Sequence, residues 1–216
     1  MAEIFGRERK FCIDFPLNKC DNRYMKELII ESKTHGTQTI LLDDEDYELV
    51  TNVHWSWYIR RFKYKDKEKW YGEAKMGPNK AKKFRKLYPD HHLPPSGCLM
   101  MHKFIMNTPK GMHTDHLNHD GLDNRKKNLR ICTASQNSQN KRLREDSRSG
   151  YKGVYTRPNG GKFQAYIGDP NTRTPRKRQI KLGSYETAEE AARVYDKAAK
   201  ELFGEFAYFN FPNEVA

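Results

Sequence analysis

The sequence predicts an α+β protein with three consecutive parts: a mixed N-terminal region, a central strand–strand–helix module, and a C-terminal three-stranded antiparallel sheet packed on one helix. Short apolar runs bounded by Gly, Pro, Asn and Asp recur along the chain and indicate strands. Two capping-box pairs, Thr133 with Gln136 and Thr187 with Glu190, each mark the first turn of a helix. The 216 residues are enough for one large domain or two small ones.

The N-terminal region, residues 1–98, is predicted to contain short strands and one helix. Apolar and β-branched residues indicate strands over 26–32, 37–42, 55–59 and 70–76. The early acids of 43–52 favour the first turn of a helix. Residues 77–97 are basic and interrupted by Pro and Gly, which predicts a loop or linker.

The remaining elements are predicted from shorter patterns. Residues 99–106 are expected to form one or two helical turns, and a polar loop containing Asp120-Gly121 joins the next two strands. The predicted strands are 112–117, 128–132, 151–157, 161–168 and 178–185. One helix is predicted from Ala134 to about Arg144. A longer one is predicted from Thr187 to Gly204, with an apolar face formed by Ala188, Ala191, Ala192, Tyr195, Ala199 and Leu202.

Positive charge is concentrated in two blocks that flank a nearly neutral stretch. Residues 51–110 hold 14 Lys and Arg against 4 Asp and Glu, and residues 141–182 hold 12 against 3. Residues 111–140 hold 4 against 3. Basic blocks attract polyanions, and each phosphate contact releases counterions. Segregation on this scale favours a nucleic-acid partner over an evenly solvated basic surface.

No membrane or secretory signal is apparent. The mean hydropathy is −0.99, no apolar run is long enough to span a membrane, and residues 1–30 contain acids without an apolar signal core. The four cysteines are far apart and form no C-x-x-C pair, which argues against a disulfide framework and against a zinc finger. We therefore expect a cytoplasmic, intracellular protein that is not secreted and has no membrane partner.

Four residues of the central module have the chemistry that phosphodiester hydrolysis requires. An attacking water must lose a proton, and the neutral imidazole of His116 can accept it near pH 7. The transition state needs a hard divalent cation, which the carboxylate of Asp115 and the amide oxygen of Asn137 can hold. The amide of Asn128 can hydrogen-bond across the loop and fix the shape of the hairpin. In a regular strand Asp115 and His116 point to opposite faces, so they share one site only if the strand ends or bends there.

These residues stand in a run that resembles the HNH endonucleases, especially those associated with mobile introns. The run covers about 99–142 and reads D-H-L-N at 115–118, D-N-R at 123–125, N-L-R at 128–130 and T-A-S-Q-N at 133–137. The resemblance implies a ββα-metal fold with His116 as the general base. It implies that Asp115 and Asn137 bind one divalent ion, Mg²⁺ or Mn²⁺. Asn128 completes the catalytic set as the structural asparagine of the hairpin.

The C-terminal part resembles the Apetala/ethylene-response-factor DNA-binding domain of plants. Its pattern is carried by Y-K-G-V at 151–154, K-F-Q-A at 162–165, D-P at 169–170, L-G at 182–183, T-A-E-E-A-A at 187–192 and N-F-P at 210–212. That family lays its sheet in the major groove of DNA. Strand positions that usually hold arginine carry Lys152, Tyr155 and Gly168 here, and Arg157 is retained, so the usual target sequence is not implied. The residues expected to contact DNA in the two modules are Arg125, Arg130, Lys152, Tyr155, Arg157, Lys162, Phe163, Arg178 and Lys181.

The leading hypothesis is a metal-dependent DNA endonuclease of homing type, acting on double-stranded DNA and compatible with a phage- or intron-encoded origin. Residues 99–146 would form the nuclease module, 147–150 the linker and 151–213 the domain that holds the target. The basic part of the N-terminal region, residues 1–98, would also contact the duplex. One site per chain favours nicking unless two chains meet on DNA, and both a monomer and a homodimer remain open. The alternative is a non-catalytic, sequence-specific DNA-binding regulator. An RNA-binding protein is a weaker hypothesis, because the sheet lacks the paired aromatics of an RNA-stacking platform.

Overall fold

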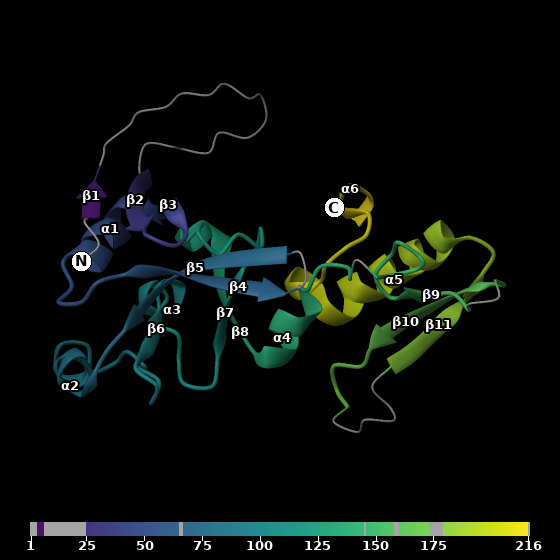
Figure 1. Cartoon of the computed structure of the whole chain (residues 1–216). Coiled ribbons are helices and arrows are strands. Elements are labelled where there is room, and N and C mark those ends of the chain that lie inside the picture. The colour runs from purple at the N-terminus through teal and green to yellow at the C-terminus, as the bar shows by residue number, and fades with distance from the viewer. Residues whose placement is uncertain are drawn as a thin grey trace. The chain divides into compact units, whose positions relative to one another are not determined.

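Two compact units, residues 1–132 and 133–216, make up the chain in the computed structural model, which describes residues 4–6, 25–64, 67–144, 146–157, 160–172 and 179–215 (Figure 1). Helices and antiparallel strands alternate in both units, which confirms the predicted α+β class. Arg178, one of the predicted DNA contacts, lies outside the described residues. No helix of the described part is long and apolar enough to cross a membrane.

The first unit joins three antiparallel sheets, with strand orders β1–β2–β3, β4–β5–β6 and β7–β8 within the described ranges. Its elements are β1 (Ile4–Gly6), β2 (Met25–Ser32), β3 (Gly36–Asp43), α1 (Asp44–Thr51), β4 (Tyr58–Tyr64), β5 (Lys67–Lys75), α2 (Pro78–Leu87), β6 (Cys98–Met100), α3 (Met101–Ile105), β7 (His113–His116) and β8 (Leu129–Cys132). The predicted helix at 43–52 is confirmed as α1, and the first two predicted strands as β2 and β3.

Two parts of this unit differ from the sequence prediction. The loop predicted over 77–97 is wrong for its first half, because α2 begins at Pro78, a residue well suited to the first turn of a helix. Ala81 and Phe84 of α2 are buried against the core, while the lysines and the one arginine of this helix remain exposed. The strands predicted over 55–59 and 70–76 extend further than predicted, because β4 and β5 pair antiparallel through the charged stretch up to Tyr64 and Lys67.

Aromatic rings form the centre of the first core. Trp55 contacts Phe84 and Phe104 with ring centroids 5.4 and 5.5 Å apart. The indole Nε1 of Trp57 donates a 2.9 Å hydrogen bond to the carbonyl of Val50 in α1. Both tryptophans precede β4, so the strand predicted over 55–59 begins only at Tyr58. Phe104 of α3 and Leu129 of β8 belong to this core, and α3 also contacts β7, so the core supports the central hairpin.

The second unit is a three-stranded antiparallel sheet of order β11–β10–β9 packed on one long helix, as predicted. Its elements are α4 (Ala134–Gln139), β9 (Val154–Tyr155), β10 (Phe163–Gly168), β11 (Gln179–Tyr185), α5 (Ala188–Phe203) and α6 (Pro212–Val215). Both predicted capping boxes are present. Helix α4 ends at Gln139, earlier than predicted, and Leu202 of the predicted apolar face is 38% exposed.

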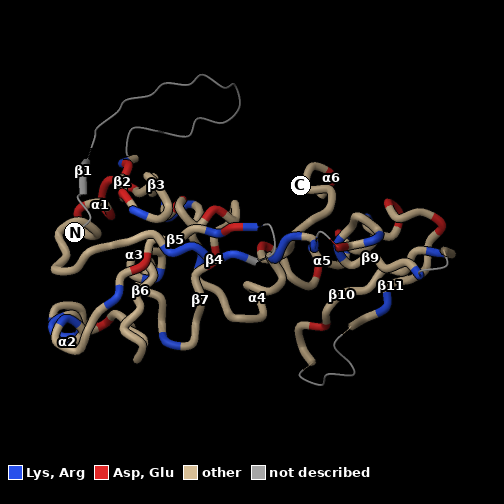
Figure 2. Tube along the Cα trace, in the orientation of Figure 1, with Lys and Arg blue, Asp and Glu red and all other residues tan. Residues whose placement is uncertain are grey.

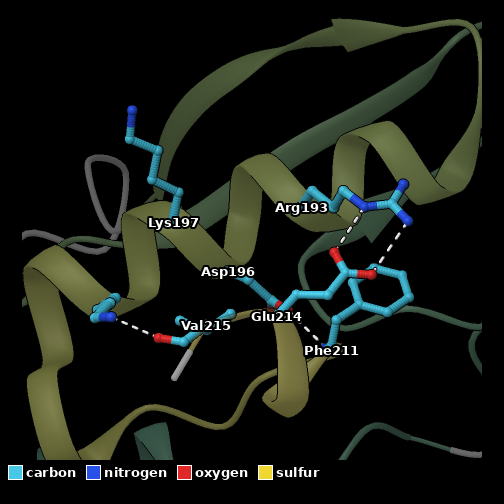
Figure 3. A pocket seen from close by; sticks show the side chains of 7 residues that line it. Arg193, Asp196, Lys197, Phe211, Glu214 and Val215 are labelled. Atoms are coloured by element: carbon cyan, nitrogen blue, oxygen red, sulfur yellow. Dashed lines mark hydrogen bonds and ion pairs between the residues drawn. The ribbon is translucent and has the colours of Figure 1, made fainter.

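The end of the chain is tied back onto α5 by a buried carboxylate. Asp196 accepts hydrogen bonds from the backbone nitrogens of Asn210 and Phe211, at 2.9 and 2.8 Å. The side chain of Asn210 in turn bonds both backbone groups of Lys152. In the shallow pocket of Figure 3, Arg193 of α5 also reaches Glu214 of α6. These bonds explain why the N-F-P segment closes the domain.

Candidate active site

His116 is the last residue of β7, and its imidazole is buried. Its Nε2 lies 3.1 Å from the amide Oδ1 of Asn124, and only 6% of the residue is exposed. An amide oxygen only accepts hydrogen bonds, so Nε2 carries the proton and donates. The remaining nitrogen, Nδ1, then holds the lone pair that a general base needs.

Two aromatic neighbours surround the same ring. The ring of His102 from α3 meets it edge-on at 4.8 Å between centroids, and that of Tyr71 from β5 lies at 5.8 Å. Burial lowers the pKa of His116, and the bond to Asn124 and the charge of Asp115 offset this only in part. Burial also lowers the pKa of His102 far below its usual value. Both imidazoles are therefore neutral near pH 7.

Asp115 is held by an arginine directly across the hairpin. The register of β7 and β8 places Asp115 opposite Arg130, whose Nε and Nη2 donate to its Oδ2 at 3.2 and 2.9 Å. Both side chains are largely buried. Arg130, predicted to contact DNA, therefore orients the carboxylate in this structure. Strand β7 ends at His116, which satisfies the condition that the strand should end beside the two residues.

The loop between β7 and β8 is closed by amide and carboxylate side chains. Asn128 accepts a bond from the backbone nitrogen of Asn118 and donates to the carbonyl of Asp123, at 3.0 and 2.8 Å. Arg125 grips both oxygens of Asp123 at 2.7 and 2.6 Å. Burial alone would raise the pKa of Asp123, but the bonds and charge of Arg125 hold it below its usual value. Asn128 thus bonds across the loop. Arg125, which was predicted to contact DNA, also stabilises the loop by pairing with Asp123.

The same loop is bonded to the edge of β3. The backbone nitrogen of Leu41 donates to the carbonyl of Leu122, and the nitrogen of Asn124 donates to the carbonyl of Leu41, both at 2.9 Å. The backbone nitrogen of Lys126 donates to Asp43 at 2.7 Å. The residue that bonds His116 is therefore positioned by a strand more than eighty residues earlier in the sequence.

The donor chemistry of the predicted ligands fits a magnesium-like ion. Asp115 offers a carboxylate oxygen and Asn137 an amide oxygen, and Mg²⁺ typically binds one or two carboxylates while keeping several waters and substrate phosphates. No three His, Cys, Asp or Glu side chains gather as a metal cluster in the described part of the chain, so the donors are not those of a closed zinc site. Asn137 lies half-buried on α4 of the second unit, and its joint role with Asp115 remains a proposal.

The predicted DNA contacts of the second unit fall into two groups. Tyr155, Arg157, Lys162 and Lys181 are exposed, although Lys162 pairs with Glu186 at 2.7 Å. Lys152 is turned inward: its Nζ donates to the carbonyls of Gln139 and Lys141, and burial lowers its pKa to about 8. Phe163 packs against the sheet–helix core.

Three residues around the base received no catalytic role from sequence reasoning. Asn124 was visible in the D-N-R run, yet nothing in the spacing showed that its amide meets His116. His102 lies in the predicted helical turns of 99–106, and nothing in the sequence showed that its ring packs against the base. Tyr71 comes from a different sheet, and only the tertiary fold brings it to the site.

Comparisons with known proteins match both halves of this description. Residues 107–139 match the family model for HNH endonucleases, and residues 149–205 match that of the AP2 domain. An uncharacterized HNH endonuclease of Acanthamoeba polyphaga mimivirus is 33% identical over 125 residues, which cover 55% of this chain and 59% of that protein. No solved structure matches the chain.

Two plant proteins are similar to the second unit alone. Dehydration-responsive element-binding protein 2E of Oryza sativa subsp. japonica is 48% identical over 63 residues, 29% of this chain and 18% of that protein. Ethylene-responsive transcription factor 1 of Solanum lycopersicum is 48% identical over 65 residues, 30% of this chain and 25% of that protein. The chain thus spans less than two thirds of each of these relatives. Both sequence resemblances are confirmed, because residues 107–139 match the HNH endonuclease model and residues 149–205 match the AP2 domain model.

Proposed function

We propose that this protein is a metal-dependent endonuclease, of homing type, that hydrolyses phosphodiester bonds in double-stranded DNA. The observation that carries the proposal is the state of His116. A buried, neutral imidazole whose Nε2–H is bound to Asn124 presents the tautomer in which Nδ1 accepts a proton. The HNH match over 107–139, which includes this residue, and the viral relative named as an HNH endonuclease support nuclease chemistry in this protein.

The reaction assigns a separate task to each neighbour. Nδ1 of His116 takes the proton of the attacking water. A divalent ion, Mg²⁺ or Mn²⁺, would be held by Asp115 and Asn137 and would supply positive charge for the phosphate and the leaving oxygen. Arg130 fixes the orientation of the Asp115 carboxylate. Asn128 keeps the loop closed around the site. By family resemblance the products carry a 3′-hydroxyl and a 5′-phosphate.

The AP2 domain would hold the DNA. Tyr155 pairs with Gln164, and Lys181 with Tyr166, so these four side chains lie on one face of the sheet, while Ala165 and Ile167 face α5. This open face, together with the exposed Arg157, offers cations and aromatic rings to a groove. The plant relatives, named as transcription factors and element-binding proteins, favour this partner.

The proposed roles of the domains keep the boundaries predicted from the sequence. Residues 99–146 would cut, 147–150 would link, and 151–213 would bind the target. One site per chain would nick one strand, and two chains meeting on DNA would produce a double-strand break. The viral relative is compatible with an intracellular, mobile-element origin.

Cleavage of a panel of supercoiled DNAs in Mg²⁺ or Mn²⁺ tests the proposal. Nicked or linear product should appear, and it should vanish in EDTA and in His116→Ala. The matched control is His92→Ala, which removes an exposed histidine of the same unit and should cut normally. A folded His116→Ala protein that cuts at the wild-type rate would falsify the assignment of the base.

A second function remains in view because the AP2 relatives are transcription factors by name. In that case the protein would be a non-catalytic, sequence-specific DNA-binding regulator. Salt-sensitive DNA retention without cleavage in either metal, for wild type and His116→Ala alike, is the result that would favour it.

A further inference from the structure

The β4–β5 hairpin has two faces with different surroundings. Its register places Arg60 opposite Tyr71 and Phe62 opposite Lys69, so these four side chains lie on one face. We refer to Arg60, Phe62, Lys69 and Tyr71 as the outer row. The opposite face carries the pair Arg61 and Trp70 and the pair Ile59 and Gly72.

The opposite face attaches the hairpin to the rest of the first unit. Trp70 meets His35 edge-on, with ring centroids 5.2 Å apart. A methyl group on Gly72 would come within about 3 Å of Ile40 and Met101, so the sheet backbone lies directly on the core here. Arg61 is paired with Glu68 at 3.3 Å. At Trp70 and Gly72 this face is therefore covered by the rest of the first unit. Further along the hairpin, the charge of Arg61 is partly neutralised by Glu68.

The outer row leads from solvent to the catalytic base through consecutive ring contacts. Arg60 lies over the ring of Phe62 at 5.3 Å, Phe62 meets Tyr71 at 5.7 Å, and Tyr71 meets His116 at 5.8 Å. The close packing of Tyr71 against the site depends on Gly121, which lies in the loop between β7 and β8, called the site loop below. A methyl group there would lie 2.3 Å from the carbonyl oxygen of Trp70 and 2.5 Å from the ring of Tyr71. The backbone of the site loop at Gly121 therefore packs directly against the ring of Tyr71 in the hairpin.

The exposed end of the outer row combines cations with an apolar ring. Phe62 is 45% exposed, and Arg60 and Lys69 flank it in the open. Within the described residues, the guanidinium of Arg60 pairs with the buried carboxylate of Glu73 at 3.9 Å. Figure 2 shows that Lys and Arg are frequent along β4 and β5. Cations contact phosphates, and an exposed ring packs against bases or sugars, a combination that suits nucleic acid better than an acidic protein.

We infer that the outer row is a second DNA-contacting surface, which presents the scissile strand to His116. The inference rests on the proposed nuclease function and adds to the AP2 domain a contact at the point of cleavage. Arg60 and Lys69 bind phosphates beside the cut, and Phe62 packs against the nucleotide between them. Because the row ends on the base, it determines which phosphate reaches His116.

Two double variants of the full-length protein separate the faces. Arg60→Gln with Lys69→Gln removes two charges from the outer row, and Arg61→Gln with Lys63→Gln removes two from the opposite face of the same hairpin. Binding is measured in EDTA on a fluorescent duplex that contains the mapped cut site, across a range of salt. Single-turnover cleavage of the same duplex is measured in Mg²⁺, and thermal melting checks the fold.

The outer-row variant should reduce the dependence of log Kd on log salt by about 1.8, since each lost phosphate contact contributes about 0.9. Its cleavage rate should fall more than tenfold, while the opposite-face variant stays within about threefold of wild type. Phe62→Ala should keep the salt slope but scatter the cut over neighbouring phosphates. If the outer-row double variant does not fold, Lys69→Gln alone, an exposed strand position, should still lower the slope by about 0.9.

The two levels of the proposal fail differently. If wild type binds and cuts, but the two double variants behave alike in slope, rate and cut position, the outer row is not a DNA surface and the nuclease function stands. If wild type neither binds nor cuts any duplex of the panel, the proposed function is wrong and this inference falls with it.

Discussion

The hydrogen bond between Asn124 and His116 predicts a specific change in pH dependence for Asn124→Asp. The substitution keeps the shape of the side chain and places a carboxylate about 3.1 Å from Nε2. A negative charge at that distance favours the imidazolium and raises the pKa of His116, by about 1–3 units for a close opposite charge. The base then stays protonated up to a higher pH, so the acid limb of the pH–rate profile moves to higher pH by about the same number of pH units.

Single-turnover cleavage from pH 5.5 to 9 measures the shift at about half-unit steps. At pH 6.5 the variant should lose a larger fraction of its own plateau rate than wild type loses, while the plateau itself is retained. Asn124→Leu should act differently, because the buried Nε2–H loses its acceptor. That loss costs about 1–3 kcal/mol, equivalent to a plateau on the order of 5- to 150-fold lower.

Asn79→Asp is the matched control, since it adds the same charge at an exposed position of α2. It should leave the profile unchanged. The reasoning is refuted if Asn124→Asp folds normally and its acid limb coincides with that of wild type. A residue that only supported the fold would lower the plateau without moving the limb.

Three further outcomes follow from contacts elsewhere. Burial lowers the pKa of His116, so wild-type cleavage should be constant above neutral pH and decline only below its ordinary value of about 6.5, as a pH–rate series would show. Lys152→Met leaves two carbonyls without their donor and should lower the free energy of unfolding in urea by about 1–3 kcal/mol. Because the folded pKa of Lys152 is about 8 against 10.5 unfolded, wild type gains stability as pH rises between these values, and its difference from the variant should widen there. Gly153→Ala should cost about 2–5 kcal/mol in the same assay, because φ is 76° and the new methyl would lie 2.0 Å from the ring of Tyr195. Gly160→Ala, at φ 81° with open space around it, should cost only about 1–2.

Local patterns predicted the elements whose causes are local. Thr133 and Thr187 cap their helices as the capping boxes indicated, because a capping box involves only residues three apart. Helix α2 was missed because its apolar positions are few, Ala81, Phe84 and the exposed Leu87, and because Gly77 and Pro78 resemble a break as much as a helix start. Three apolar positions among many lysines are too few to establish a helical period.

The candidate site was predictable in its residue types but not in its partners. His116, Asp115 and Asn128 were identified from the motif, whereas the partner of each side chain depends on the tertiary fold. Arg130 could have been paired with Asp115 from the hairpin register, since opposite charges face each other on neighbouring strands. The meeting of Asn124 with His116 requires β3 to hold the loop, and no local pattern contains that information.

The bonds between the β7–β8 loop and β3 limit how the proposed nuclease module can be transplanted. A cassette cut at residue 99 would retain every motif residue but would lose Leu41 and Asp43, which bond the backbone of the loop, and Tyr71, which packs against the base. The backbone groups of the loop that bond β3 would then face water, and Asn124 would no longer be held in the orientation that bonds His116. A graft intended to cut DNA should therefore begin no later than β2 and carry strands β2 to β6, so the smallest transferable unit is about three times as long as the motif that identifies it.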